Sequence, residues 1–361
     1  MDEYDLLICG AGPAGSFLGK LCSDAGIRTI IIDGRQEIGV PLYAGELVDL
    51  SSFSKVLPIQ RDMVNFFPID RIQYFLTDSE GKGNPINFFP DMEGSSGTLD
   101  REKLDKEMAA LAALSGADIR IRTRMAGWER TESNIRARLI RDGRIDEISS
   151  RIIIRADGPD QNKIQNSKGI SVVSGRIFSS DTYESQIFMG LNSNRGFKMD
   201  LQKGDGFRNL ILKGEQLDLD SYKRSGWTGI HEMSFSFIFP PVPLGDLEVN
   251  IGSRCMGPEP FFLSGLHLSM QTANLALNYA KDVMNGAELE VAGETYRKSI
   301  EILSGQLARS MKLHDLLQKM NAVQVEKLQN YLGGSEIHGF SSDSLLRDAG
   351  LSIEKITEEF R

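Results

Sequence analysis

The sequence predicts an α/β fold, and three features of its first thirty residues support this prediction. A short apolar run from Leu6 to Cys9 has the composition of a buried strand, and an isoleucine-rich run from Thr29 to Ile32 has the same character. Between them, apolar residues recur at helical spacing and end before Gly26, a residue typical of a helix end. Together these segments predict a βαβ unit.

Three glycines lie between the first strand and the helix. Gly10, Gly12 and Gly15 have the spacing G-x-G-x-x-G. Gly10 permits a tight turn, Gly12 lets backbone N–H groups approach a diphosphate, and Gly15 lets the helix pack on the strand. Asp33 follows the second strand, where a carboxylate accepts hydrogen bonds from ribose hydroxyls. The segment predicts a dinucleotide-binding site; the alternative is a tight turn without a ligand.

The composition narrows the class of protein. With 361 residues, 40% of them hydrophobic, the chain suits one large or two closely connected α/β domains. A net charge of −9 without any basic cluster argues against a nucleic-acid partner. The three cysteines form neither a C-x-x-C pair nor a metal spacing, so we expect no metal site. An acidic start and the lack of an apolar run of about 18 residues predict a cytoplasmic protein.

The next hundred residues alternate between strand and helix patterns. Residues 72–89 predict a hairpin with its turn at 80–83. In the segment 98–121, Leu104, Met108, Leu111 and Ala112 recur at helical spacing and predict a helix that stops at Ser115 and Gly116, before a strand at 119–121.

A β-meander is expected from Ala126 to Ile154, with Asp142 and Gly143 as a two-residue type I′ turn. Its last strand ends in Asp157 and Gly158. Open α/β sheets bind ligands at the carboxyl ends of their strands, so both residues are binding candidates. An ordinary turn is the alternative.

Residues from about 170 to 250 predict a mostly β insertion. One strand within it alternates cleanly and puts Phe235, Phe237 and Phe239 on one face. These rings line an apolar substrate cavity or belong to a plain sheet core.

The rest of the chain is expected to be helical. A long helix starts at about Ser264, and every element beyond Gly286 is predicted to be a helix, with 296–320 the longest. Its basic face, with Arg309, Lys312 and Lys319, is either a solvated face of a docked helix or a peripheral contact with a membrane. The sequence has no second G-x-G-x-x-G, so we expect one bound nucleotide.

With these motifs in order, the chain resembles the geranylgeranyl reductase family, FAD-dependent members of the p-hydroxybenzoate hydroxylase superfamily that saturate prenyl chains. The resemblance spans most of the chain. The motifs are GAGPAG at 10–15, IGVPLYAGE at 38–46, TLDREKLDKEMAALAALSGADI at 98–119, ADG at 156–158, FSFIFP at 235–240 and LARSMKLHDLLQKM at 307–320.

The resemblance implies a fold, a cofactor and a substrate class. The fold is α/β, with a Rossmann-like FAD-binding domain of the p-hydroxybenzoate hydroxylase type, a β-rich substrate domain and C-terminal helices. FAD is the implied cofactor and a prenyl lipid the implied substrate, with electrons from NAD(P)H or a donor protein. The residues that match the family's FAD site are Gly10, Gly12, Pro13, Ala14, Gly15, Asp33, Gly34, Arg35, Ala44, Gly45, Arg101, Ala126, Asp157, Gly158, Gly265 and Leu266.

The same resemblance divides the chain into three parts. Residues 1–165 and 250–290 are expected to form a discontinuous FAD-binding domain, whose 60–95 strands join the substrate domain. Residues 166–249 form a shortened β-rich substrate domain, and residues 291–361 form a C-terminal helical region.

Two departures from the family pattern concern the flavin end of the site. Ala44 replaces a cysteine beside the flavin, and Ser253 stands where the acid of a Gly-Asp dyad is expected. The turn that follows carries Phe261, Phe262 and Leu263 in place of residues that leave room for the flavin pyrimidine. These departures predict a weakened isoalloxazine site and an intact ADP site.

Reduction of an isolated alkene requires a hydride from the flavin and a proton from an acid. Tyr43, Glu46 and Cys255 are the candidate acids, with a structural role as the alternative for each. The main functional hypothesis is an FAD-dependent reductase of a prenyl lipid. The alternatives are a hydroxylase that uses FAD and NADPH, and a non-catalytic subunit that retains the fold.

Overall fold

The computed structural model describes the chain in twelve segments, and the account below concerns these residues. They are 1–40, 47–50, 60–77, 84–132, 134–158, 170–178, 185–190, 197–202, 207–213, 228–235, 240–245 and 248–359.

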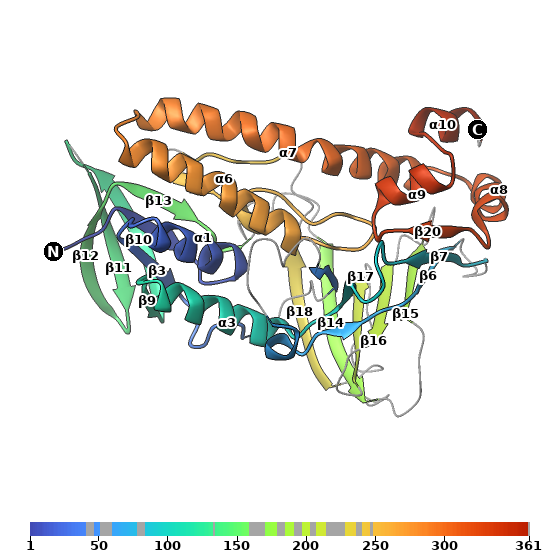
Figure 1. Ribbon diagram of the computed structural model, residues 1–361, viewed down its shortest axis with the longest axis horizontal. Helices are drawn as coiled ribbons and strands as arrows, with labels where there is room; N and C mark the ends of the chain where they lie inside the picture. The colour runs from blue at the N-terminus through green and yellow to red at the C-terminus, as the bar shows by residue number, and fades with distance from the viewer. Residues whose placement is uncertain are drawn as a thin grey trace.

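A five-stranded parallel sheet forms one half of the molecule (Figure 1). Its strands, in spatial order, are β19 (Glu248–Asn250), β13 (Ile152–Arg155), β2 (Leu6–Cys9), β3 (Thr29–Asp33) and β9 (Asp118–Ile121). The strands β2, β3 and β13 have apolar residues at successive positions because both faces of the sheet are covered.

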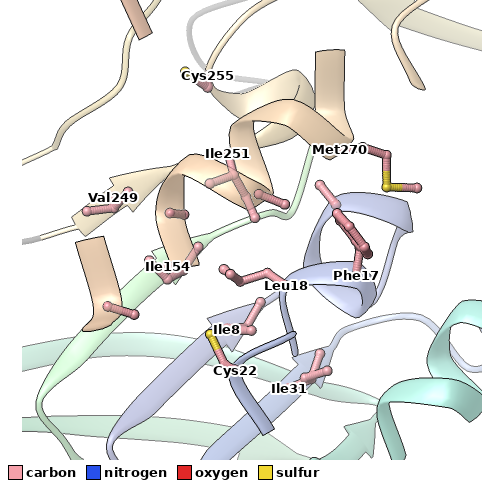
Figure 2. Close-up of a cluster of buried hydrophobic side chains, with 14 of the residues drawn as sticks. Ile8, Phe17, Leu18, Cys22, Ile31, Ile154, Val249, Ile251, Cys255 and Met270 are labelled. Atoms are coloured by element: carbon pink, nitrogen blue, oxygen red, sulfur yellow. The ribbon is translucent and has the colours of Figure 1, made fainter. Parts of the chain in front are cut away.

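Helices α1 (Pro13–Asp24) and α6 (Leu266–Met284) pack on one face of this sheet. Figure 2 shows Ile8 and Ile31 pointing from the sheet toward Leu18 and Phe17 of α1. A third helix, α3 (Arg101–Leu114), packs beside α1 and adds Leu104 and Met108 to the same core. The predicted βαβ unit is confirmed.

The other face is covered by a four-stranded sheet that contains the predicted meander. Its strands are β1 (Asp2–Glu3), β12 (Arg144–Ser150), β11 (Ile135–Arg141) and β10 (Thr123–Arg130). At the turn between β11 and β12, φ is +48° at Asp142 and +77° at Gly143, which confirms the type I′ turn.

An eight-stranded sheet forms the other half of the molecule. In spatial order its strands are β18 (Thr228–Phe235), β14 (Ile170–Phe178), β17 (Phe207–Lys213), β16 (Phe197–Gln202), β15 (Ser185–Gly190), β6 (Ile72–Thr77), β7 (Ile86–Phe89) and β20 (Glu336–His338). The hairpin predicted at 72–89 supplies β6 and β7, which pair antiparallel.

The prediction that every element beyond Gly286 is a helix is wrong at β20. This three-residue strand pairs in parallel with β7, and Gly339 N–H donates to Phe89 O at 2.8 Å. So short a strand is fixed by its neighbour rather than by local propensity, and the sequence carries no periodic signal for it.

Helix α7 (Leu289–Gln318) runs along both halves (Figure 1). Its first half packs Tyr296 and Ile300 into the core beneath α6, and its second half packs Leu313 and Leu317 against the eight-stranded sheet. The remaining elements are α8 (Ala322–Leu332), α9 (Ser342–Asp348), α10 (Ile353–Glu359), the short strands β4 (Leu47–Asp49), β5 (Phe67–Pro68) and β8 (Ser96–Thr98), and the 3₁₀ turns η1 (Arg61–Val64) and η2 (Gly252–Arg254). The division into three parts stays a prediction, since α7 contributes to both cores.

Candidate functional site

The glycine turn between β2 and α1 is closed on the side of the sheet and open above it. Gly10 has a φ of +114°, and a Cβ there would lie 2.4 Å from the carbonyl oxygen of Ala156. A Cβ on Gly15 would lie 1.9 Å from the carbonyl oxygen of Gly10. At Gly12, by contrast, a Cβ would meet no atom of the described residues within 4 Å. The turn therefore needs glycine at two positions for packing and leaves the backbone at Gly12 accessible.

The amino end of α1 suits an anion. Gly12 is its N-cap residue, Pro13 occupies its first turn, and within the described part of the chain no side chain caps this end. The first turn also lacks an acidic residue. Backbone N–H groups and the positive end of the helix dipole are thus available to a diphosphate, so these residues fit the ADP half of FAD.

Asp33 is buried at the end of β3 and is paired within the protein. Its carboxylate accepts the N–H of Ala11 at 2.8 Å and that of Arg35 at 2.8 Å. It also receives the Arg35 guanidinium at 2.8 Å. Burial opposes ionisation, but Arg35 and the two N–H groups outweigh it and hold the pKa of Asp33 below its usual value. A ribose at this site would therefore meet a carboxylate that Arg35 keeps charged and oriented.

A residue that the sequence analysis missed lies across Gly34. A Cβ on Gly34 would be 2.3 Å from Nε of Arg124, so the Arg124 side chain passes directly over this glycine. Arg124 belongs to β10, and Ala126 follows it at a bulge between Met125 and Gly127. Only the pairing of distant segments brings β10 to the end of β3, and no local pattern around Arg124 indicates it.

Asp157 and Gly158 lie beside the glycine turn, since a Cβ on Gly10 would be 2.8 Å from Cα of Asp157. Arg155 donates to the Asp157 carboxylate at 2.5 Å and to Glu248 at 3.1 Å. Nε of Arg254 is 3.9 Å from the same aspartate. The predicted candidate is therefore part of a network of charged side chains at the carboxyl edge of the five-stranded sheet.

The turn η2 occupies the place of the expected Gly-Asp dyad. Gly252 has a φ of +59°, and a Cβ there would lie 2.9 Å from Cβ of Ala14 in α1. Its N–H donates to the hydroxyl of Thr272 at 2.8 Å. Gly252 is thus needed for the close approach of η2 to the first turn of α1, and Ser253 follows it, where the resemblance predicts the acid.

Cys255, one of the predicted acids, follows η2 and is 0% exposed. Burial raises the pKa of its thiol to about 12. It lies near Tyr296, whose hydroxyl donates to Asn250 O at 2.8 Å. Cys255 belongs to the same buried apolar cluster as Ile251, and Figure 2 shows it at the margin of that cluster. Its burial favours the structural alternative for this residue.

The turn before α6 is held by a buried carboxylate. Glu259 accepts the N–H of Phe261 at 2.9 Å and that of Phe262 at 2.8 Å, and the hydroxyl of Ser310 on α7 donates to its other oxygen. Burial raises the pKa of Glu259 to about 7, although these hydrogen bonds favour the charged form. Leu263 has a φ of +50°, which is unfavourable for a branched side chain.

The two phenylalanines of this turn pack against the eight-stranded sheet. The ring of Phe262 is 5.6 Å from that of Tyr74 and 5.1 Å from that of Phe88. Phe261 lies 6.3 Å from Tyr74, and each phenylalanine is 1% exposed. Gly265 is the N-cap residue of α6 and Leu266 begins the helix, again without a side-chain cap among the described residues. The predicted pair thus starts a second helix close to η2.

Arg101 starts α3 and forms an ion pair with Asp105, with an N–O distance of 3.1 Å. Several other predicted residues lie outside the described residues: Tyr43, Ala44, Gly45, Glu46, Phe237 and Phe239. For Phe235 the structure places the backbone at the end of β18. Their proposed roles stay predictions.

Neither a metal centre nor a membrane span is found among the described residues. None of their histidine, cysteine, aspartate and glutamate side chains form a group of three or more that could hold a metal ion. Within the same residues, no helix has both the length and the apolar character needed to cross a membrane.

Comparison with solved structures defines the class of fold. The chain is similar to a geranylgeranyl bacteriochlorophyll reductase-like protein from Thermoplasma acidophilum, with a TM-score of 0.85, 19% identity, and coverage of 99% of this chain and 98% of that one. It is also similar to PqsL, a probable FAD-dependent monooxygenase from Pseudomonas aeruginosa, with a TM-score of 0.67, 14% identity, and coverage of 88% and 97%. The fold is that of flavin-dependent enzymes of the p-hydroxybenzoate hydroxylase type.

Comparison with curated proteins gives relatives named digeranylgeranylglycerophospholipid reductase. The protein from Thermoplasma volcanium is 26% identical over 348 residues, covering 91% of this chain and 78% of the relative. That from Methanosarcina mazei is 31% identical over 166 residues, covering 44% and 38%. No family model matches the chain. The chain is thus similar in sequence to these reductases and similar in fold to the geranylgeranyl reductase-like structure.

Proposed function

We propose that the protein is an FAD-dependent reductase that saturates carbon–carbon double bonds of a prenyl lipid or a related isoprenoid. The observation that supports this most strongly is the relation to the Thermoplasma volcanium reductase across 91% of the chain. The open backbone at Gly12, beside a buried and ionised Asp33, adds a site that fits the ADP half of the cofactor.

In this proposal, bound FAD supplies the hydride, and the chain's own residues bind and orient. The amino end of α1 receives the diphosphate through its backbone N–H groups. Asp33, which Arg35 keeps charged, accepts hydrogen bonds from the ribose hydroxyls. On the adenine side, Arg124 lies over Gly34, and Ala126 follows Met125 in the same strand. Tyr43 and Glu46 stay the candidates for the acid that gives a proton to the second carbon.

A prenyl substrate does not by itself require a basic membrane-binding face on α7. Arg309 pairs with Asp343 at 2.9 Å, and Lys312 lies 3.9 Å from Glu354. These acidic partners offset the positive charge, which supports the alternative of a docked helix with a solvated face. The cytoplasmic location and the source of electrons stay predictions.

The test is a single-turnover experiment on the purified full-length protein. The bound flavin is reduced under anaerobic conditions, and prenylated lipids are then added while the flavin absorbance is followed. We expect the flavin to reoxidise and the lipid to gain two hydrogen atoms per double bond reduced, measured by mass spectrometry. If reduced flavin persists with every prenyl lipid tried, the proposal is wrong.

The two alternatives give different results in related experiments. A hydroxylase would consume NADPH and oxygen once an aromatic substrate binds, and its fold is shared with PqsL. A non-catalytic subunit, suggested by Ser253 at the dyad position, would be colourless and would not take up FAD on reconstitution.

A further inference from the structure

The strand β20 lies at one end of the eight-stranded sheet and, among the described residues, pairs only with β7. The carbonyl oxygen of Ser335 and the N–H of Gly339 bond to β7, at 2.9 Å and 2.8 Å. Because backbone groups alternate between the two sides of a paired strand, those of Glu336 and His338 point away from β7. These two residues form the outer edge of the sheet.

A strand edge of this kind can pair with a strand of another chain. The β20 strand of a second copy suits this edge, because two antiparallel β20 strands centred on Ile337 would place Glu336 of each copy opposite His338 of the other. Each of these residue pairs would exchange both of its backbone hydrogen bonds, and an acidic side chain would lie opposite a histidine. The edge is therefore self-complementary.

Helix α9 covers this edge at His338. The carboxylate of Asp348 accepts the N–H of His338 at 2.7 Å, and the guanidinium of Arg347 donates to the His338 carbonyl oxygen at 2.6 Å. Arg347 also donates to Asp348 at 2.6 Å, so the two side chains form one unit. Together they occupy both backbone groups that a second strand would need at this position.

The contact between α9 and β20 depends mainly on other side chains (Figure 1). Leu345 of α9 is buried in the same apolar cluster as Ile337 of β20. The ion pair between Arg347 and Asp348 lies at the surface, with the arginine side chain 60% exposed. Exposed ion pairs contribute little to folding stability. Their position over a strand edge therefore calls for an explanation other than stability.

We propose that Arg347 and Asp348 prevent β20 from pairing with β20 of a second copy of this chain. In the two-fold arrangement each residue pair contains His338 of one copy, so covering His338 alone blocks both pairs. The inference does not depend on the proposed function, because it concerns association of the chain and not the cofactor site.

The experiment measures the mass of the full-length protein by light scattering after size-exclusion chromatography, over a wide range of protein concentration. Arg347→Ala combined with Asp348→Ala uncovers both backbone groups of His338. We expect self-association to become about tenfold tighter or more, so that the mass approaches twice the wild-type value as the concentration rises. Asp348→Ala alone uncovers only the N–H and should give a smaller increase.

Three further variants test whether the contact lies at β20. Asp348→Asn keeps a side-chain oxygen that can accept from His338, so its mass should equal that of the wild type. Arg309→Ala is the matched control, because it removes a 2.9 Å ion pair between α7 and Asp343 of α9 but leaves His338 covered. Adding Glu336→Pro to the double variant removes an outward N–H from the edge and should restore the wild-type mass.

Association of the double variant that Glu336→Pro reverses would support the inference. A double variant that keeps the wild-type circular dichroism and urea midpoint, and also the wild-type mass at every concentration, would overturn it. Association that Glu336→Pro does not reverse would also overturn it, because the contact would then lie elsewhere. If the double variant does not fold, Asp348→Ala decides, and a folded Asp348→Ala protein with the wild-type mass throughout contradicts the inference.

Discussion

The glycine turn before α1 and the turn at 259–264 before α6 both lead into a long helix, but they are built in opposite ways. The first has glycine at positions of positive φ or close approach, and its backbone is open above Gly12. The second has Leu263 at a φ of +50° and is held by a buried Glu259. The comparison shows one turn with an open backbone at Gly12 and one turn that is filled by packed side chains.

This difference agrees with the prediction that the flavin half of the expected cofactor site is weaker than the ADP half. The first turn has glycine at three positions, so no side chain at these positions covers its backbone N–H groups. At the second, Phe261 and Phe262 are committed to the core with Tyr74 and Phe88. We therefore expect ligand binding to depend mainly on the first turn and folding stability on both.

The largest expected effect comes from filling Gly15. A Cβ at this position would overlap the carbonyl oxygen of Gly10 at 1.9 Å, so Gly15→Ala should lower the free energy of unfolding by on the order of 3 kcal/mol or more, measured in urea. Gly12→Ala is the matched control, because its φ of −75° and open surroundings accept a methyl group. The control should fold as the wild type does and lose affinity for FAD. Equal stability of the two variants would contradict the account of the turn.

The next effect concerns the buried carboxylate of the second turn. The pKa of Glu259 is raised from 4.5 to about 7 in the folded protein. Its neutral carboxyl group therefore contributes fully to the free energy of unfolding below about pH 4.5, and this contribution is lost as the pH rises toward 7. The loss is about 3 kcal/mol for a shift of this size. Glu259→Gln removes the titration, and the slope of unfolding free energy between pH 5 and pH 7 should flatten.

Two neighbouring side chains influence the titration of Glu259. Ser310 on α7 and Asp343 on α9 face the same carboxylate, and Asp343 acts in the same direction as burial. Asp343→Asn should therefore reduce the slope slightly without removing it. A slope that is unchanged in Glu259→Gln would show that the carboxylate does not titrate in this range.

A smaller effect is expected at Asp33. Its pKa is lowered, so its pairing with Arg35 stabilises the protein above the unfolded pKa and is lost as pH falls. Arg35→Ala should cost about 1 to 2 kcal/mol at pH 7, and the difference from the wild type should shrink at an acidic pH, as the pH falls through the lowered pKa of Asp33. Unfolding in urea at both pH values measures it, with Arg35→Lys as the variant that keeps the charge. A cost that persists at low pH would point to lost packing instead.

The smallest effect is expected on the outer face of α7. The ion pair between Arg309 and Asp343 is largely exposed at the arginine, so Arg309→Ala should change the free energy of unfolding by less than about 1 kcal/mol. Binding of the variant and the wild type to vesicles with anionic lipids can be compared by sedimentation. Strong binding that is lost in Arg309→Ala would favour the membrane contact over the solvated face.

The sequence predicted those parts of the fold that depend on local pattern. The glycine spacing, the continuous apolar runs and the pair Asp142 and Gly143 each need particular residues at particular positions, and the structure confirms the elements they predicted. The short β20 was missed because its pairing with β7 alone defines it. The departure at Ser253 and Leu263 was visible in the sequence.

Within the candidate site, the sequence could indicate residue types but not their partners. Asp33 was expected to meet a ribose, and its pairing with Arg35 and Ala11 depends on the detailed turn after β3. Arg124 lies over Gly34 because β10, a strand of the meander, passes the end of the parallel sheet. The spacing of residues in the sequence does not predict this contact. The buried hydrogen bonds of Glu259 likewise join a turn to a helix some fifty residues away, at Ser310.

In the proposed function, the glycine turn binds the diphosphate of FAD. The most direct measurement is the nucleotide content of the purified full-length protein, obtained from its visible spectrum and from the ligand released on denaturation. We expect a yellow protein that releases an equimolar amount of FAD, and a Gly12→Ala variant that folds but releases much less. A wild-type protein that is colourless and takes up neither FAD nor ADP on reconstitution would contradict it.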